Sequence, residues 1–187
     1  MAEQQEEKSF KGVTYTLCDN WIPHIQLSGG PINYCEIGVF YGANLLRFAH
    51  IFPNASLTGV DPWLDYNEYP EYKSEMSSIY SVFLENLNKS PYKDRITIHR
   101  GFSHDVMPTL PNNYFNIIYI DGNHERNFVL KDAQMAYEKT LVGGYIIFDD
   151  INWDSVREAF FIFIELYKGK VEYIALANCQ TICRKIA

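Results

Sequence analysis

Two glycines four residues apart follow an apolar stretch, in the segment Glu36-Ile-Gly38-Val-Phe-Tyr41-Gly42. Glycine tolerates positive φ angles and lets the backbone approach a ligand closely. A helix that begins after such a turn presents free N–H groups to a bound group. The spacing differs from the Gly-x-Gly-x-x-Gly of dinucleotide-binding folds, and the segment lacks the Lys-Ser/Thr pair of a P-loop. It therefore argues against NAD and ATP as ligands.

Asp61 strengthens a ligand-binding interpretation of this segment. It follows the apolar stretch 56–60, at a point where a carboxylate can accept hydrogen bonds from both hydroxyls of a ribose. Each feature also has a purely structural alternative, because the glycines can serve only a tight connection and the acid can cap a strand end. Both features occur in the order that a ligand site requires, so ligand binding is the favoured interpretation.

Asp121, Asp149 and Asp150 follow two further apolar stretches. Their oxygens suit a hard divalent cation such as Mg²⁺, which would acidify a bound hydroxyl and orient its oxygen for nucleophilic attack. Without a cation the three carboxylates would repel one another. The alternative is that Asp149 and Asp150 cap the next helix and that Asp121 belongs to an Asp-Gly turn.

His124 follows Asp121 by three residues. It is a candidate general base, since an unperturbed histidine has a pKa near ~6.5. A histidine in a polar loop can equally serve only as a hydrogen-bonding residue. The loop from Trp63 to Tyr72 combines aromatic and acidic side chains, and we interpret it as a lid or, alternatively, as a solvated loop.

Strand and helix patterns alternate along the chain and must position these residues. Strands are expected at 33–37, 56–60, 95–99, 115–120, 145–148, 171–177 and 181–186, and helices at 43–52, 74–88, 127–140 and 154–168. This order predicts an α/β fold with a doubly wound, Rossmann-like, mostly parallel seven-stranded sheet and a C-terminal antiparallel hairpin. The candidate residues follow strands, where such sheets bind ligands. We also expect segment 14–30 to form a short helix over one edge of the sheet, and Gly143-Gly144 to end the helix at 127–140.

The whole-chain composition is that of a globular protein, with 47% hydrophobic and 21% charged residues among 187. We expect a flexible acidic tail at 1–9 and a single domain at 10–187. No apolar run reaches the ~20 residues of a membrane span, and the four cysteines form no CxxC pair, so we expect a cytoplasmic protein with reduced thiols and no membrane partner. The net charge of −7 disfavours nucleic acid as a partner.

Three of these motifs together resemble class I methyltransferases that use S-adenosylmethionine (SAM). They are Glu-Ile-Gly-x-x-x-Gly, Gly59-Val-Asp61 and Ile120-Asp-Gly-Asn-His124. More narrowly, the last of them with the segment 143–150 is similar to the metal-dependent sugar and small-molecule O-methyltransferases, the group of macrocin O-methyltransferase. The resemblance covers residues 33–153.

The resemblance assigns roles to particular residues. For SAM it implies Glu36, Gly38, Tyr41, Gly42, Asp61, Ser103 and Asp121; for the metal Asp121, Asp149 and Asp150; and for catalysis Asp121 and His124. Ser103 matches the position near adenine, where the family often has an acid beside a small residue. In this sequence that acid is absent unless Asp105 supplies it.

The resemblance implies methyl transfer from SAM to a hydroxyl of a small molecule, with a sugar or glycan as the preferred acceptor and Mg²⁺ or another divalent cation assisting. Three alternatives remain open: an inactive SAM-binding module, a metal-independent methyltransferase that uses His124, and a nicotinamide-linked enzyme, which the glycine spacing disfavours. A second subunit could complete the acceptor site, so a homo-oligomer is also left open.

Overall fold

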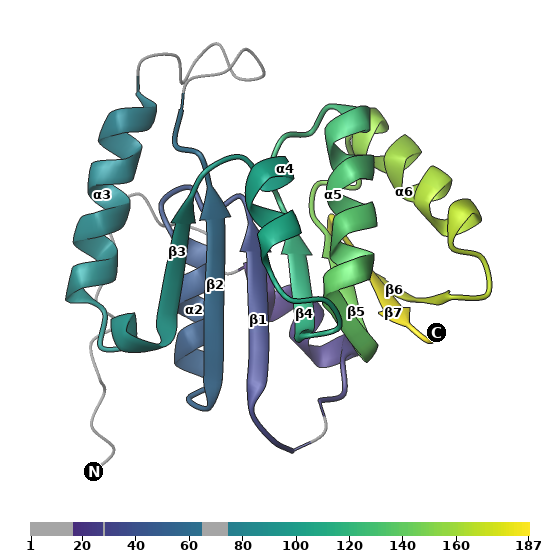
Figure 1. The fold of residues 1–187 in the computed structure, drawn as a ribbon, viewed down its shortest axis with the longest axis horizontal. Helices are drawn as coiled ribbons and strands as arrows, with labels where there is room; N and C mark the ends of the chain where they lie inside the picture. The colour runs from purple at the N-terminus through teal and green to yellow at the C-terminus, as the bar shows by residue number, and fades with distance from the viewer. Residues whose placement is uncertain (1–16, 28, 65–74) are drawn as a thin grey trace.

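A computed structural model describes residues 17–27, 29–64 and 75–187 of the chain (Figure 1). The strands are β1 Ile32–Ile37, β2 Ala55–Asp61, β3 Ile96–Arg100, β4 Phe115–Ile120, β5 Thr140–Phe148, β6 Val171–Ala177 and β7 Gln180–Lys185. The α-helices are α1 Leu17–Trp21, α2 Ala43–Ile51, α3 Met76–Lys89, α4 Ser103–Val106, α5 Arg126–Lys139 and α6 Asp154–Leu166. No helix within the described ranges is long and apolar enough to cross a bilayer. The tail predicted at 1–9 and most of the predicted lid, residues 65–72, lie outside the described residues.

The strands form one sheet in the order β3-β2-β1-β4-β5-β7-β6. Strands β1 to β5 pair in parallel, whereas β7 pairs antiparallel with both β5 and β6. The predicted fold class, with its C-terminal antiparallel hairpin, is therefore confirmed. Because β1 and β4 are neighbours, the strand order reverses between them, and such a reversal opens a crevice at the carboxyl ends of the strands.

Alternate residues of the central strands face two separate cores, as the two-residue repeat of a strand requires. Tyr34 of β1 and Tyr119 of β4 belong to the core under α1, α2 and α3. Cys35 and Ile118, the residues next to Tyr34 and Tyr119 in their strands, belong to the core under α5 and α6. Helices thus cover both faces of the sheet (Figure 1).

In segment 14–30, the short helix α1 does not cover an edge of the sheet as we expected, but the 3₁₀-helix Ile22–His24 that follows it contacts the edge strand β6. Trp21 of α1 is fully buried and stacks on Tyr34, Phe48 and Tyr119, with ring centroids 5.8 to 6.5 Å apart. Tyr34 and Tyr119 lie on β1 and β4, the two strands at the centre of the sheet. The burial of this large aromatic side chain draws α1 over the middle of the sheet.

The prediction that Gly143 and Gly144 end the helix before them is wrong. Helix α5 ends at Lys139, strand β5 begins at Thr140, and both glycines lie inside the strand. Gly143 has φ +88, and a Cβ at Gly144 would lie 2.8 Å from the carbonyl oxygen of Asn116 in β4. The pairing of β4 with β5 shifts register at this point. Glycine is needed here because an irregular strand approaches its neighbour closely.

Candidate functional site

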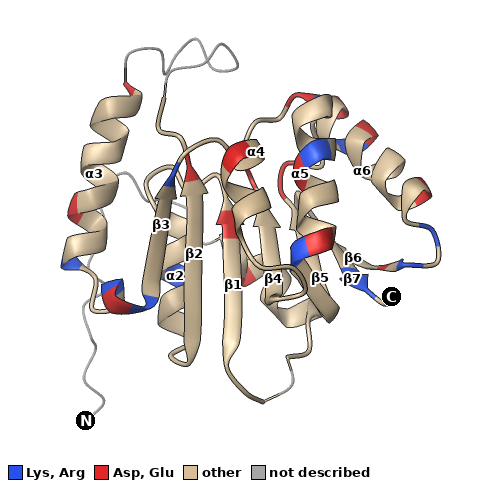
Figure 2. Ribbon diagram, viewed as in Figure 1, with Lys and Arg blue, Asp and Glu red and all other residues tan. Residues whose placement is uncertain are grey.

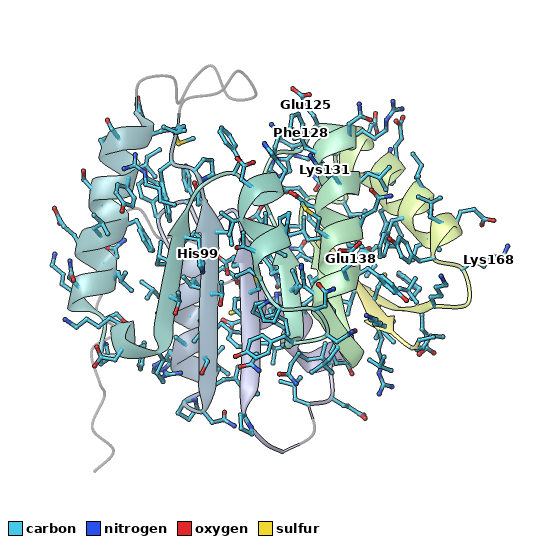
Figure 3. All side chains as sticks on the ribbon, viewed as in Figure 1. His99, Glu125, Phe128, Lys131, Glu138 and Lys168 are labelled. Carbon is cyan, nitrogen blue, oxygen red and sulfur yellow. The ribbon has the colours of Figure 1, made fainter. Side chains whose placement is uncertain are left out.

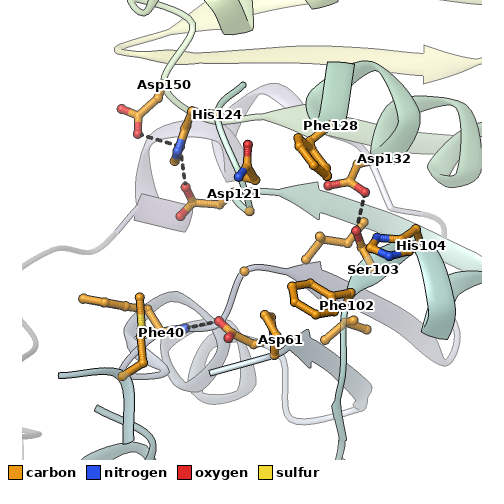
Figure 4. A pocket seen from close by; sticks show the side chains of 17 residues that line it. Phe40, Asp61, Phe102, Ser103, His104, Asp121, His124, Phe128, Asp132 and Asp150 are labelled. Carbon is orange, nitrogen blue, oxygen red and sulfur yellow. Dashed lines mark hydrogen bonds and ion pairs between the residues drawn. The ribbon is translucent and has the colours of Figure 1, made fainter. Parts of the chain in front are cut away.

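A cavity of about 510 Å³ opens at the carboxyl ends of β1, β2 and β4, where the strand order reverses (Figure 4). Its volume lies in the range of small-molecule sites. Among the predicted site residues, the cavity is lined by Gly38, Asp61, Ser103, Asp121, His124 and Asp150, whereas Glu36, Tyr41, Gly42 and Asp149 lie outside this lining. The structure therefore brings residues from the carboxyl ends of five strands, β1 to β5, to one site.

Gly38 makes the first turn of this site possible. It has φ +87, and a Cβ at this position would lie 1.8 Å from the carbonyl oxygen of Asp121. The backbone N–H of Asp121 donates to the carbonyl of Ile37 at 2.8 Å, and that of Gly38 donates to Val60 at 2.9 Å. The turn after β1 is thus packed directly against the turn after β4.

Asp61 holds the glycine segment in place from the end of β2. Its Oδ2 accepts hydrogen bonds from the N–H groups of Val39 and Phe40 at 2.8 and 2.9 Å, and its Oδ1 accepts from Trp63 at 2.7 Å. Phe40 and Trp63 both have positive φ angles, so these bonds support unusual backbone geometry. Asp61 also lines the cavity. Asp61 therefore stabilises the turn, and the ligand-binding interpretation stays a prediction.

Glu36 is buried behind the cavity, with 1% of its surface exposed. Its Oε2 accepts hydrogen bonds from the Tyr34 hydroxyl at 2.6 Å and from Asn44 Nδ2 at 2.9 Å. Burial raises the pKa of Glu36 to about 8. In this structure Glu36 links β1 to α2.

Tyr41 and Gly42 also act away from the cavity. The Tyr41 carbonyl accepts a hydrogen bond from Asn86 Nδ2 at 3.1 Å, which ties the segment to α3. Gly42 is the N-cap of α2 with φ +85, and a Cβ there would lie 2.9 Å from the ring of Phe83. Both residues therefore hold the glycine segment through contacts with α3, away from the cavity.

Asp121, His124 and Asp150 form what we call the acidic–histidine cluster (Figure 4). The His124 Nε2 lies 3.2 Å from Oδ2 of Asp150 and 3.6 Å from Oδ1 of Asp121. One potential ligand atom from each residue lies within 4.8 Å of the others. Burial raises the pKa of Asp121 to about 7, the neighbouring His124 opposes this rise, and the charges of Asp149 and Asp150 add to it. Mixed oxygen and nitrogen donors at this spacing can hold a metal ion or exchange a proton.

Asp149 lies next to Asp150 in the sequence but serves a different network. Its Oδ2 accepts a hydrogen bond from the Tyr119 hydroxyl at 2.5 Å, and Gln180 Nε2 donates to the same hydroxyl at 2.8 Å. Its Oδ1 accepts from the Asp150 N–H. The N-cap of α6 is Trp153, with no side-chain capping bond, so the structure does not support helix capping by the two aspartates. The group of metal-ligating side chains that the structure brings together contains His124 in place of Asp149.

Ser103 has an acidic partner that the sequence interpretation missed. Its Oγ donates to Oδ1 of Asp132 on α5 at 2.6 Å, and Asp132 lines the cavity with 3% of its surface exposed. The side chain of Asp105, by contrast, is 72% exposed and does not line this cavity. Asp132 lies three residues after Val129 and four before Ala136, both buried. A charged residue on the apolar face of a helix is the sequence signal that could have identified it.

The family model described as a methyltransferase domain matches residues 35–151, well over half of the chain. A curated relative, an uncharacterized protein of Acanthamoeba polyphaga mimivirus, is 28% identical over 121 residues, which are 64% of this chain and 51% of that protein. The chain thus spans about half the length of the curated relative that it matches.

Solved structures share the fold at low identity. The O-methyltransferase NovP has a TM-score of 0.69 and 16% identity, with 90% of this chain and 76% of that chain covered. A protein described as a candidate rRNA-methylase from Clostridium thermocellum has a TM-score of 0.67 and 16% identity, with 94% of this chain and 98% of that chain covered. The O-methyltransferase TomG from Streptomyces achromogenes, solved in complex with SAM, has a TM-score of 0.64 and 15% identity, with 83% of this chain and 73% of that chain covered. These likenesses establish the Rossmann-like fold.

Proposed function

Because the chain belongs to the methyltransferase domain family, we propose that it transfers a methyl group from SAM to a hydroxyl group of a small molecule. The observation that carries the proposal is the cavity that joins Gly38 and Asp61 to the acidic–histidine cluster. The hydroxyl oxygen attacks the methyl carbon, the bond electrons return to sulfur, and the hydroxyl proton is released. The products are the methyl ether and S-adenosylhomocysteine (SAH).

The glycine turn and Asp61 are the proposed cofactor-binding elements. Gly38 lets the backbone after β1 approach the methionine end of SAM, as the resemblance to the family implies. A carboxylate has about four lone-pair sites, and the backbone occupies three of those of Asp61. The remaining site can accept a ribose hydroxyl. Figure 2 shows acidic residues at the carboxyl ends of β1 and β2, where Glu36 and Asp61 lie.

The acidic–histidine cluster fits a divalent cation. Asp121 and Asp150 converge on His124 Nε2, and a cation would offset the repulsion that helps to raise the pKa of Asp121. Imidazole suits metals such as Fe²⁺ or Zn²⁺, whereas carboxylates suit Mg²⁺ or Mn²⁺, so the cluster offers ligands to both groups of metals. When bound, such a cation would make an acceptor hydroxyl more acidic.

A metal-independent reaction is the second candidate. His124 Nε2 lies between two carboxylates, and both would stabilise the protonated imidazole. His124 could therefore accept the proton that the acceptor hydroxyl loses. In this alternative Asp121 and Asp150 orient His124 and stabilise its positive charge.

The acceptor that we propose is neutral, with a sugar as the preferred class. Trp153 is 41% exposed, and its ring centroid lies 5.0 Å from that of His124. Its face can stack on the apolar face of a sugar ring. Within the described part of the chain, four carboxylates line the cavity, those of Asp61, Asp121, Asp132 and Asp150. Together with the net charge of −7, they disfavour acceptors that carry phosphate groups, RNA included.

The proposal is tested by measuring SAH formation from SAM with a panel of neutral sugars, phenols and RNA, in the presence of Mn²⁺, Mg²⁺ or a chelator. We expect turnover with a neutral hydroxyl compound that the chelator abolishes and Mn²⁺ restores. Turnover that survives the chelator but is lost in His124→Gln would support the metal-independent alternative. SAM binding without transfer to any acceptor would indicate a binding module and contradict the proposal.

A further inference from the structure

The Ser103–Asp132 pair lies on the side of the cavity away from the acidic–histidine cluster (Figure 4). Phe102 and Phe128, which are 39% and 42% exposed, line the cavity beside this pair. Figure 3 shows Phe128 near the beginning of α5, at the end of the molecule toward which the parallel strands run. Aromatic faces next to a polar pair suit a flat heterocycle that also carries hydrogen-bonding groups.

The loop that carries Ser103 is tied to the proposed ribose site. The N–H of Gly101 donates to the backbone carbonyl of Asp61 at 3.0 Å, and β2 and β3 are neighbours in the sheet. A base attached to a ribose at Asp61 can therefore extend toward Phe102 and Ser103. This step rests on the proposed function, because it takes the bound ligand to be SAM or SAH.

The buried carboxylate determines which way the Ser103 hydroxyl points. An ionised carboxylate only accepts hydrogen bonds, so the single proton of Ser103 Oγ is committed to Asp132 Oδ1, 2.6 Å away. The lone pairs of Ser103 Oγ can then only accept. A ligand edge that meets Ser103 must accordingly present a donor.

We propose that Asp132 is a positioning residue that fixes Ser103 as a hydrogen-bond acceptor and thereby makes the cofactor site select a 6-amino purine over a 6-oxo purine. The exocyclic amine of adenine donates to Ser103 Oγ. In hypoxanthine a carbonyl oxygen occupies the same position, and it would face lone pairs. In this proposal Asp132 acts on the base through Ser103, to which its Oδ1 is hydrogen-bonded.

The proposal requires an ionised Asp132, which sets the pH of its test. Burial raises the pKa of Asp132 to about 7, while the hydrogen bond from Ser103 and the charge of Lys131 oppose this rise. At pH 8.5 the carboxyl group is therefore ionised and can only accept.

The test compares the affinities of SAH and S-inosylhomocysteine, which differ in the group at purine position 6 and its tautomer, by calorimetry at pH 8.5. We expect the wild type to prefer SAH by roughly 10- to 100-fold, the effect of one mismatched hydrogen bond in a shielded site. In Asp132→Asn the amide can donate to Ser103 and free its proton for the ligand. The preference should then fall to within about 3-fold.

Three further variants separate this effect from a general loss of structure. Ser103→Ala should lose the preference in the same way, and it tests the proposal if Asp132→Asn does not fold. Ser103→Thr, which keeps a hydroxyl, should retain the preference. Asp105→Asn is the matched control, because its side chain is 72% exposed, and it should behave as the wild type.

Two results would overturn the inference, and they differ in what they say about the proposed function. If the wild type binds SAH but Asp132→Asn or Ser103→Ala keeps the full preference, the inference is wrong and the proposed function stands. If the wild type binds neither compound, the proposed function fails and the inference fails with it.

Discussion

Gly38 and Asp121 lie in direct backbone contact, so that a Cβ at position 38 would lie 1.8 Å from the carbonyl oxygen of Asp121. These residues directly follow β1 and β4, the neighbouring strands between which the sheet reverses its order. The contact fixes the proposed cofactor-binding turn against the loop that carries Asp121 and His124 of the acidic–histidine cluster. A side chain at position 38 would push apart the two halves of the site.

Gly38→Ala should lower the free energy of unfolding by at least about 3 kcal/mol, since it combines a positive φ with a backbone clash. Gly169→Ala is the matched control, because Gly169 has φ +75 but a Cβ at this position would meet no heavy atom within 4 Å, and it should cost only about 1 kcal/mol. Denaturant unfolding of both variants measures the difference. Equal losses would show that the contact with Asp121 does not constrain position 38.

Asp150→Asn and Asp149→Asn should differ in their effect on Mn²⁺ binding. Asp150 belongs to the acidic–histidine cluster, whereas Asp149 accepts a hydrogen bond from the Tyr119 hydroxyl. Loss of a ligating carboxylate should weaken Mn²⁺ binding by at least about 10-fold, and Asp149→Asn should weaken it less than about 3-fold. Calorimetric titration with Mn²⁺ distinguishes them, and the reverse order would assign the metal site to Asp149.

Glu36 should make the protein less stable as the pH rises from 5 to 9. Its pKa is raised from 4.5 to about 8 in the folded state, so the folded state retains a proton that the unfolded state loses above pH 4.5. This contribution to stability is complete below pH 4.5 and is lost as the pH rises through 8. A tenfold difference in proton affinity between the two states corresponds to about 1.4 kcal/mol.

The measurement is the unfolding free energy of the wild type and of Glu36→Gln across this pH range. The decline should be smaller in Glu36→Gln by a few kcal/mol, because glutamine carries no titrating proton. Glu165→Gln changes a side chain that is 74% exposed and should keep the wild-type decline. A Glu36→Gln variant with the wild-type decline would refute a protonated, buried Glu36.

Trp153→Ala should raise the KM for a sugar acceptor by roughly 3- to 10-fold through the loss of an aromatic stacking face. Its ring lies beside His124, so the affinity for SAH should not change. Phe161→Ala removes an exposed aromatic within α6 whose ring packs on Phe160, and it should have no effect. Initial rates at saturating SAM give the KM for the sugar in the wild type, in Trp153→Ala and in Phe161→Ala. A change in SAH affinity alone would place Trp153 at the cofactor instead.

The fold was predictable because its signals are local and repetitive. The alternation of strand and helix patterns predicts the seven strands and the C-terminal hairpin that the structure contains. From the sequence, the start of β5 was placed too late, because Gly143 and Gly144 could either end a helix or lie in an irregular strand. The register shift between β4 and β5 shows that they lie in an irregular strand. The place of Trp21 depends on stacking with strands far away in sequence, which no local pattern encodes.

The residues of the candidate site were predictable because they follow strands, whereas the directions of their side chains were not. Asp149 and Asp150 are consecutive, yet only Asp150 reaches His124, and its positive φ turns the chain at this point. Asp132 was missed because an acid within a helix is usually solvated. Its position among buried residues of α5 becomes informative only once that helix is known to cover the cavity.

Calorimetric titration of the purified protein with SAM and with SAH, each with and without Mn²⁺, tests whether the cavity binds the methyl donor. We predict micromolar binding by the wild type, roughly −8 kcal/mol, at least 10-fold weaker binding in Asp61→Ala, and unchanged binding in Asp105→Ala. If neither SAM nor SAH binds to the wild type under either condition, the cavity is not a SAM site and the proposed methyltransferase activity is contradicted.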